Sequence, residues 1–147
     1  MLMFKQLLRI ALLAGCIAVA MVGCASAPTG TLYDRLGGQP VMFEVTGKTL
    51  ERAAHDPRTM RSFDGIKLAT LHQSLFTHIC SIAGGGCRYE GDTMAKAHHD
   101  LKIQHSEYDA MVDILREELD AAHVDPGAKN ELLKLLAPMK RDIVAHD

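Results

Sequence analysis

Apolar side chains recur every three or four positions through most of the chain after residue 31, and this spacing restricts the fold more than any other feature. One such group lies within residues 68–82 and another within residues 108–119. This spacing gathers apolar side chains on one face of a helix, whereas strands show a period of two that the sequence lacks. We therefore expect an all-α domain with helices near residues 31–36, 40–54, 67–82, 94–101, 107–123 and 127–145.

The first 23 residues have the pattern of a targeting segment. Lys5 and Arg9 precede an apolar run over residues 10–23 that is too short to span a bilayer comfortably as a helix. Residues 21–24, at the end of this run, read Met-Val-Gly-Cys and resemble the lipobox of bacterial lipoproteins. We expect residues 1–23 to be a signal peptide and Cys24 to carry lipid. An ordinary signal peptide or a short membrane anchor is the alternative.

Lipidation of Cys24 would place the folded part outside the cytoplasm. Residues 24–30 would form a small flexible tether and residues 31–147 the folded domain. Ser26 points to the outer membrane by the usual sorting rule, so we expect the protein in the envelope of a Gram-negative bacterium, facing the periplasm. Acidic residues outnumber basic ones by 18 to 16, which argues against nucleic-acid binding. Contact with the membrane would then come from the lipid rather than from a basic protein surface.

Two of the four cysteines remain once Cys16 leaves with the signal peptide and Cys24 is lipidated. Cys80 and Cys87 enclose a glycine-rich stretch that can close on itself, and a disulfide can persist outside the cytoplasm. We favour a disulfide over two free thiols. A metal-binding pair is less expected, because the spacing exceeds that of the usual zinc ligands.

Two adjacent histidines, His98 and His99, lie in a short amphipathic stretch that Thr93 can cap. Neighbouring helical residues point about 100° apart, so the two cannot face the same object. A helix this short gains little from its own hydrogen bonds. Either a bound ligand or the cysteine link with packing of Tyr89 must hold it in place. Taken alone, His98 is more often a core histidine than a ligand.

Three blocks of sequence stand in register: TLYDRLGGQP at residues 31–40, the glycines followed by RYEG at residues 84–91, and MAKAH at residues 94–98. Together they resemble the group I truncated haemoglobins. The lipoprotein signal, with the cysteine pair around the glycines, resembles a lipoprotein branch of that family. The resemblance implies a two-on-two helical sandwich that binds haem iron. Because no Cys-x-x-Cys-His motif is present, the haem is expected to be non-covalent haem b.

The resemblance also implies roles for individual residues. His98 takes the place of the proximal iron ligand, and His99 then lies toward solvent or a haem propionate. Phe63 falls where the family wedges the haem with a phenylalanine. Leu50 replaces a tyrosine that donates a hydrogen bond to bound oxygen. The other positions facing the haem are Leu71 and Leu75, often polar in the family, and His78, which replaces a phenylalanine.

These replacements imply weaker oxygen retention than in a tyrosine-bearing member. The favoured function is reversible binding of O₂ or NO at the cell envelope. A second possibility is a b-type electron-transfer or peroxidase-like protein with His78, or His72 if the helix is shifted, as sixth iron ligand. A third is a helical lipoprotein that no longer binds haem. Enzymatic turnover would need a source of electrons, and the sequence shows no flavin or nicotinamide site. The redox partner is not identified, so whether the protein is an enzyme stays open.

Overall fold

The computed structural model describes residues 29–145, and the proposed signal peptide, with Cys16 and Cys24, lies outside them. The described part is helical, as expected. Its elements, in order, are α2 (Leu32–Arg35), α3 (Gly38–His55), the 3-10 turn η1 (Met60–Phe63), α4 (Leu68–Ile82), α5 (Met94–His98), the 3-10 turn η2 (His99–Leu101), α6 (His105–Ala121), α7 (Pro126–Leu136), the 3-10 turn η3 (Ala137–Met139) and α8 (Lys140–Ile143).

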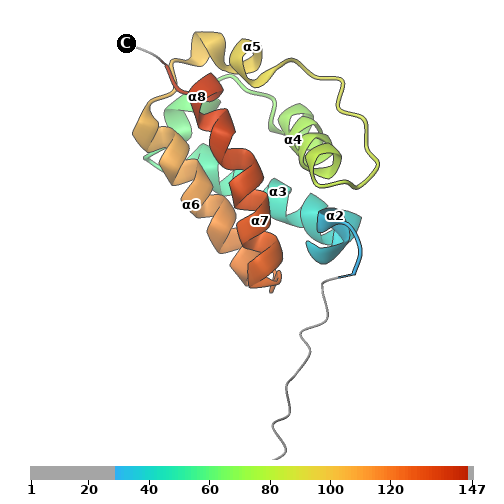
Figure 1. Ribbon diagram of the computed structural model, residues 1–147. Coiled ribbons are helices and arrows are strands. Elements are labelled where there is room, and N and C mark those ends of the chain that lie inside the picture. The colour runs from blue at the N-terminus through green and yellow to red at the C-terminus, as the bar shows by residue number, and fades with distance from the viewer. Residues whose placement is uncertain (1–28, 146–147) are drawn as a thin grey trace, which may run out of the picture.

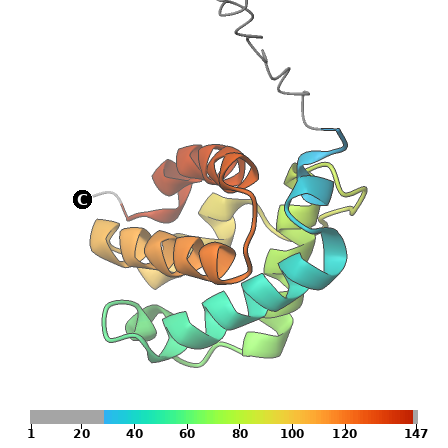
Figure 2. The same cartoon turned by 90° about the horizontal axis from the view of Figure 1, so that it is seen from below.

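Four longer helices form the frame. Helix α3 packs against both α4 and α6, and α6 also contacts α7. Figures 1 and 2 show the α3–α4 pair facing the α6–α7 pair, with the short α5 at one end. No helix between residues 29 and 145 combines the length and apolar character needed to cross a membrane.

The core lies where the two helix pairs meet. Its fully buried side chains come from all four helices and from the turn after α2, and they include Leu36, Met42, Ile79, Leu119 and Leu132. Burial of such side chains stabilises each by about 1.5–3 kcal/mol before conformational entropy is subtracted. These side chains belong to one hydrophobic cluster, which also includes Leu32 and Tyr33 of α2.

Helix α3 buries polar side chains as well as apolar ones. Thr46 and Thr49 are fully buried, and their hydroxyls donate to the carbonyls of Met42 and Val45, one turn earlier. These bonds satisfy groups that would be costly to bury alone. The helical spacing of Phe43, Leu50 and Ala54 predicts that Phe43 faces inward, but it is 44% exposed.

The ends of the helices follow the expected capping in part. Thr93 caps α5 through the Lys96 amide, and Asp125 caps α7 through the Ala128 amide, with Pro126 at the first helical position. The spacing of Ser106 and Asp109 predicts a capping box, but this prediction is wrong, because both residues lie inside α6 (His105–Ala121). The helix begins earlier, and Gln104 with Glu107 forms the box of α6.

The helix expected over residues 127–145 is broken into α7, η3 and α8. Pro138 explains the break, because it has no amide proton and its ring clashes with the carbonyl four residues earlier. At the end of α8 the chain becomes extended at Val144, which forms a parallel bridge with Ile103, and the Ala145 amide donates to the Ile103 carbonyl. The helix expected over residues 94–101 is also divided. Helix α5 ends at His98, and the 3-10 turn η2 follows it.

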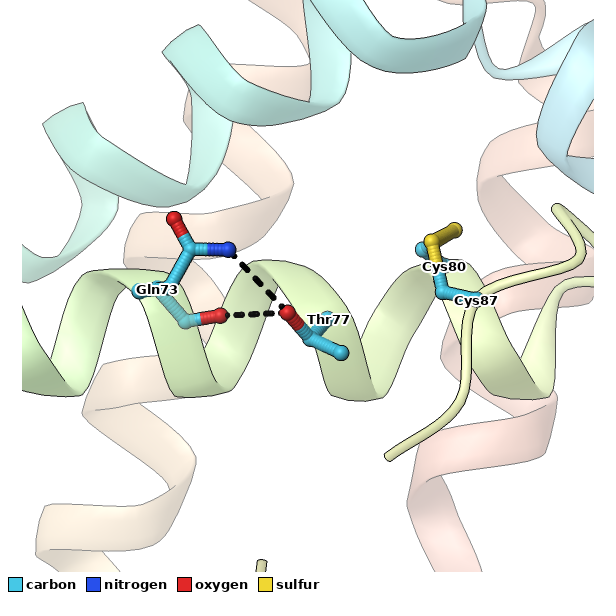
Figure 3. The surroundings of a disulfide bond; sticks show 4 residues. All are labelled: Gln73, Thr77, Cys80 and Cys87. Atoms are coloured by element: carbon cyan, nitrogen blue, oxygen red, sulfur yellow. Dashed lines mark hydrogen bonds between the residues drawn. A yellow bond between two sulfur atoms is a disulfide. The ribbon is translucent and has the colours of Figure 1, made fainter. Parts of the chain in front are cut away.

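A disulfide joins Cys80 of α4 to Cys87 in the loop that leads to α5, as Figure 3 shows. The loop passes very close to the disulfide and to α2. A Cβ added at Gly85 would lie 2.6 Å from the Tyr33 ring and 2.7 Å from the Cys80 sulfur. Glycine at this position therefore allows the loop to approach the core, and the disulfide anchors it to α4.

Candidate functional site

A cavity of about 310 Å³ lies between the two helix pairs, at the end that α5 covers. Its volume falls at the lower end of the roughly 300–1,000 Å³ typical of ligand pockets. Most of its wall is apolar. The six side chains that the sequence predicts to contact haem all line this one cavity: Leu50, Phe63, Leu71, Leu75, His78 and His98.

His98 enters the cavity from the last residue of α5 and is half-buried. Its Nδ1 lies 2.7 Å from the carbonyl oxygen of Met94. A carbonyl can only accept, so Nδ1 carries the proton and donates, which leaves a lone pair on Nε2 of the neutral ring. This is how proteins usually orient a histidine that binds a metal through its second nitrogen.

His99 points away from the cavity. Its side chain is 82% exposed, and Nδ1 lies 2.9 Å from a carboxylate oxygen of Asp100. The two adjacent histidines therefore face different environments, and only His98 lines the cavity.

His78 projects into the cavity from α4. Both of its ring nitrogens are buried and have no hydrogen-bond partner among residues 29–145. Burial lowers the pKa of His78 below its ordinary value, so the ring is neutral at pH 7. Its ring packs edge-on against that of Tyr89. Buried polar atoms without a partner are uncommon, so these two nitrogens are candidates for binding a ligand.

His72 does not line this cavity. Its Nε2 lies 2.8 Å from the Phe43 carbonyl oxygen and 3.2 Å from the Thr46 hydroxyl, so the ring packs on α3. It borders a smaller pocket of about 140 Å³ on the other side of Leu50. Of the two histidines considered as a sixth ligand, the structure brings only His78 into the cavity.

Most hydroxyl groups on the cavity wall already donate to protein acceptors. Thr49 donates to the Val45 carbonyl and Thr59 to the Ala53 carbonyl. The hydroxyl of Tyr108 donates to the carbonyl of Leu136. Leu50, Leu71 and Leu75 have only alkyl side chains. A small ligand in the cavity would therefore meet few free hydrogen-bond donors, with His78 the most prominent.

The sequence did not predict the charged side chain in the cavity wall or the partner that binds it. Glu107 lines the cavity wall and is 8% exposed, and Arg61 forms an ion pair with it. Burial alone would raise the Glu107 pKa, but hydrogen bonds from Arg61, the Gln104 amide and Ser62 outweigh burial and lower it. The only sequence signal was the spacing of Gln104 and Glu107, which fits a capping box.

These side chains fit the haem that the sequence resemblance implies. The cavity offers an apolar wall, one imidazole oriented by a backbone carbonyl in His98, and a second unpartnered imidazole in His78. A haem iron needs a strong axial donor in apolar surroundings, and a neutral imidazole provides it. No three His, Cys, Asp or Glu side chains between residues 29 and 145 group as ligands of a bare metal ion.

Comparisons with known proteins agree with this arrangement. Residues 31–145 match the family described as bacterial-like globin. A group 1 truncated haemoglobin from Nostoc sp. (strain MUN 8820) is 30% identical over 114 residues, which cover 78% of this chain and 97% of that protein.

Two solved structures share the fold. Truncated haemoglobin from Tetrahymena pyriformis in its Fe(III) form has a TM-score of 0.76 at 22% identity, covering 80% of this chain and all of that one. The 2/2 haemoglobin of Synechococcus sp. PCC 7002, solved in the cyanomet state with covalently attached haem, has a TM-score of 0.74 at 23% identity, covering 78% of this chain and 98% of that one. This chain therefore belongs to the bacterial-like globins, among the group 1 truncated haemoglobins.

Proposed function

We propose that this protein binds haem b in the cavity next to α5 and uses it to bind a diatomic gas reversibly. The observation that carries the proposal is the state of His98, whose Nδ1 donates to the Met94 carbonyl and whose Nε2 is free for a metal. The haem iron would supply a coordination position for O₂ or NO, which no amino-acid side chain offers.

The remaining cavity residues would hold the cofactor by contact. Phe63 from η1 and Leu71 and Leu75 from α4 would cover its apolar surface. An apolar lining would largely exclude water from the cavity, and the exclusion of water protects a reduced iron from side reactions. Leu50 is 3% exposed and would face the gas with an alkyl group. We therefore expect gas to bind reversibly with little hydrogen-bond retention.

The experiment is to express the full-length sequence with haem supplied and record absorption spectra of the ferric, ferrous and gas-exposed forms. We expect a Soret band, and a ferrous spectrum that changes with O₂ or NO and returns when the gas is removed. Absence of a Soret band would refute haem binding. A Soret band that is insensitive to both gases would refute the gas-binding function alone.

A second candidate function, electron transfer through a bis-histidine haem, is favoured by one observation. Both nitrogens of His78 are buried in the cavity without a partner among the described residues, and iron ligation would provide one. His78→Phe and His72→Phe form a matched pair for the test, because both residues lie on α4 and only His78 lines the cavity. A low-spin ferrous spectrum that is lost only in His78→Phe would support this function. A five-coordinate ferrous wild type would exclude it.

We also propose that the protein is a lipoprotein of the cell envelope, attached through Cys24. The sequence before Cys24 supports this, and a disulfide between Cys80 and Cys87 is typical of proteins outside the reducing cytoplasm. Intact-mass measurement of the purified full-length protein tests it. We expect a chain that begins at an acylated Cys24 and no acylation in Cys24→Ser; an unmodified chain would refute the anchor.

A further inference from the structure

The chain segment directly after His98 has little structure of its own to hold it. It consists of the short η2, then Lys102 in the left-handed region with φ of 47°, then Ile103. Non-glycine residues rarely adopt such a φ unless surrounding contacts enforce it. The bridge from Ile103 to Val144 holds the far end of the segment. Other contacts must hold its near end, next to α5.

The guanidinium of Arg61 supplies those contacts. Its Nη1 donates to the Leu101 carbonyl and its Nη2 to the Lys102 carbonyl, each at 3.2 Å. Both acceptors lie three or four residues beyond His98. Arg61 belongs to η1, two residues before Phe63, so these bonds join η1 to the segment that follows α5.

Glu107 fixes the direction of the Arg61 side chain. Nε of Arg61 donates to Oε1 of Glu107 at 3.0 Å, and Nη2 donates to Oε2. The same carboxylate accepts from the Ser62 hydroxyl and from the Gln104 amide, at 3.0 and 2.8 Å. Glu107 is thereby held by η1 and by its own helix cap. A buried, multiply bonded carboxylate orients the planar guanidinium fork so that its other donors reach the two carbonyls.

We propose that Arg61 is a positioning residue for His98, because it fixes the backbone that leaves α5 and so holds the imidazole in place for iron. This inference rests on the proposed function insofar as His98 is the iron ligand. An ordinary surface ion pair is the competing explanation, since 57% of the Arg61 side chain is exposed and such pairs contribute little to stability. The two explanations differ in the carbonyl contacts, because an ion pair with Glu107 alone would leave residues 99–103 unaffected.

The test compares three variants of the full-length protein. Arg61→Met removes every donor while keeping an unbranched side chain, and Arg61→Lys keeps the charge but not the fork. Arg58→Met is the matched control, because Arg58 precedes η1 and its side chain pairs with Asp56, away from α5. Three measurements apply: amide hydrogen exchange of residues 99–103 without haem, the ferrous iron–histidine stretching band, and the rate of haem loss to a haem-scavenging apoglobin.

Arg61→Met is expected to speed exchange at residues 99–103, to broaden or shift the iron–histidine band, and to release haem roughly tenfold faster or more, as when a partner of a metal ligand is removed. Arg61→Lys should fall between Arg61→Met and the wild type, and Arg58→Met should match the wild type. Exchange in Arg61→Met equal to that in Arg58→Met would overturn the inference. So would faster exchange with an unchanged band and haem-loss rate. If the wild type bound no haem, the proposed function would fail and the positioning role with it, while exchange would still report whether Arg61 holds the segment.

Discussion

The rings of His78 and Tyr89 pack edge to face, with 4.8 Å between their centroids and 68° between their planes. His78 lies two residues before Cys80, and Tyr89 lies two residues after Cys87. The disulfide therefore fixes both chain segments close to this contact. One covalent bond thus holds a loop residue against a half-buried histidine of the candidate haem cavity.

His78 makes the stability of the haem-free protein depend on pH. Burial lowers the pKa of His78 in the folded protein, whereas the unfolded chain protonates it near the ordinary value of 6.5. Well above pH 6.5 the His78 ring is neutral in both the folded and the unfolded chain. There it does not make the free energy of unfolding depend on pH. Below pH 6.5 the unfolded chain binds a proton that the folded protein does not, so stability falls until the folded pKa is reached. Urea unfolding between pH 7.5 and 5 measures this dependence.

His78→Phe should remove this part of the pH dependence, because phenylalanine fills the same space without titrating. The other titratable side chains on the cavity wall, His98, Glu107, Tyr89 and Tyr108, stay in place in this variant. The slope lost should be no steeper than about 1.4 kcal/mol per pH unit, the limit for one proton. Equal slopes in the wild type and His78→Phe would contradict the assignment.

Loss of the disulfide should destabilise the fold. The bond closes a loop with a sequence separation of 7, for which chain entropy predicts a stabilisation of about 2–3 kcal/mol. Cys87→Ala should lower the free energy of unfolding by that amount, measured in urea. Adding reductant should bring the wild type to the same value and should leave Cys87→Ala unchanged. A wild type insensitive to reductant, with the thiols shown to be free, would contradict a structural role.

A hydroxyl at position 50 should slow the release of oxygen. Leu50 lines the cavity and is buried, and it occupies the position where the family often has tyrosine. A hydrogen bond from Leu50→Tyr would stabilise bound O₂ by about 1 kcal/mol, which corresponds to several-fold slower dissociation. Leu50→Phe is the control, since it adds the ring without the hydroxyl. Stopped-flow dissociation rates that are equal in the two variants would show that position 50 does not face the gas.

The sequence predicted the all-α fold from helical spacing, which is a local pattern. The cavity residues came from the family resemblance: register with its sequence blocks placed Leu50, Phe63, Leu71, Leu75 and His78, and all five line one cavity with His98. The exposure of Phe43 could not be read from the same spacing. The buried stripe of α3 is completed by Thr46 and Thr49, whose hydroxyls bond to the helix backbone.

The contacts that hold the chain segment directly after His98 depend on tertiary structure and could not be predicted. Arg61 and Glu107 are 46 residues apart, and nothing in the sequence around either one pairs them. The Ile103–Val144 bridge likewise joins two segments that are far apart in the sequence, at the point where the chain leaves α8. Pro138 was visible in the sequence, but the contact that α8 makes with α5 depends on tertiary packing.

The most direct test of the central claim is the absorption and resonance Raman spectrum of His98→Gly, recorded with and without added imidazole. We expect wild type and His99→Gly to share one axial histidine signature. His98→Gly should lose this signature, and imidazole should restore it by filling the space that the side chain leaves. An unchanged signature in His98→Gly without imidazole would show that His98 is not the iron ligand.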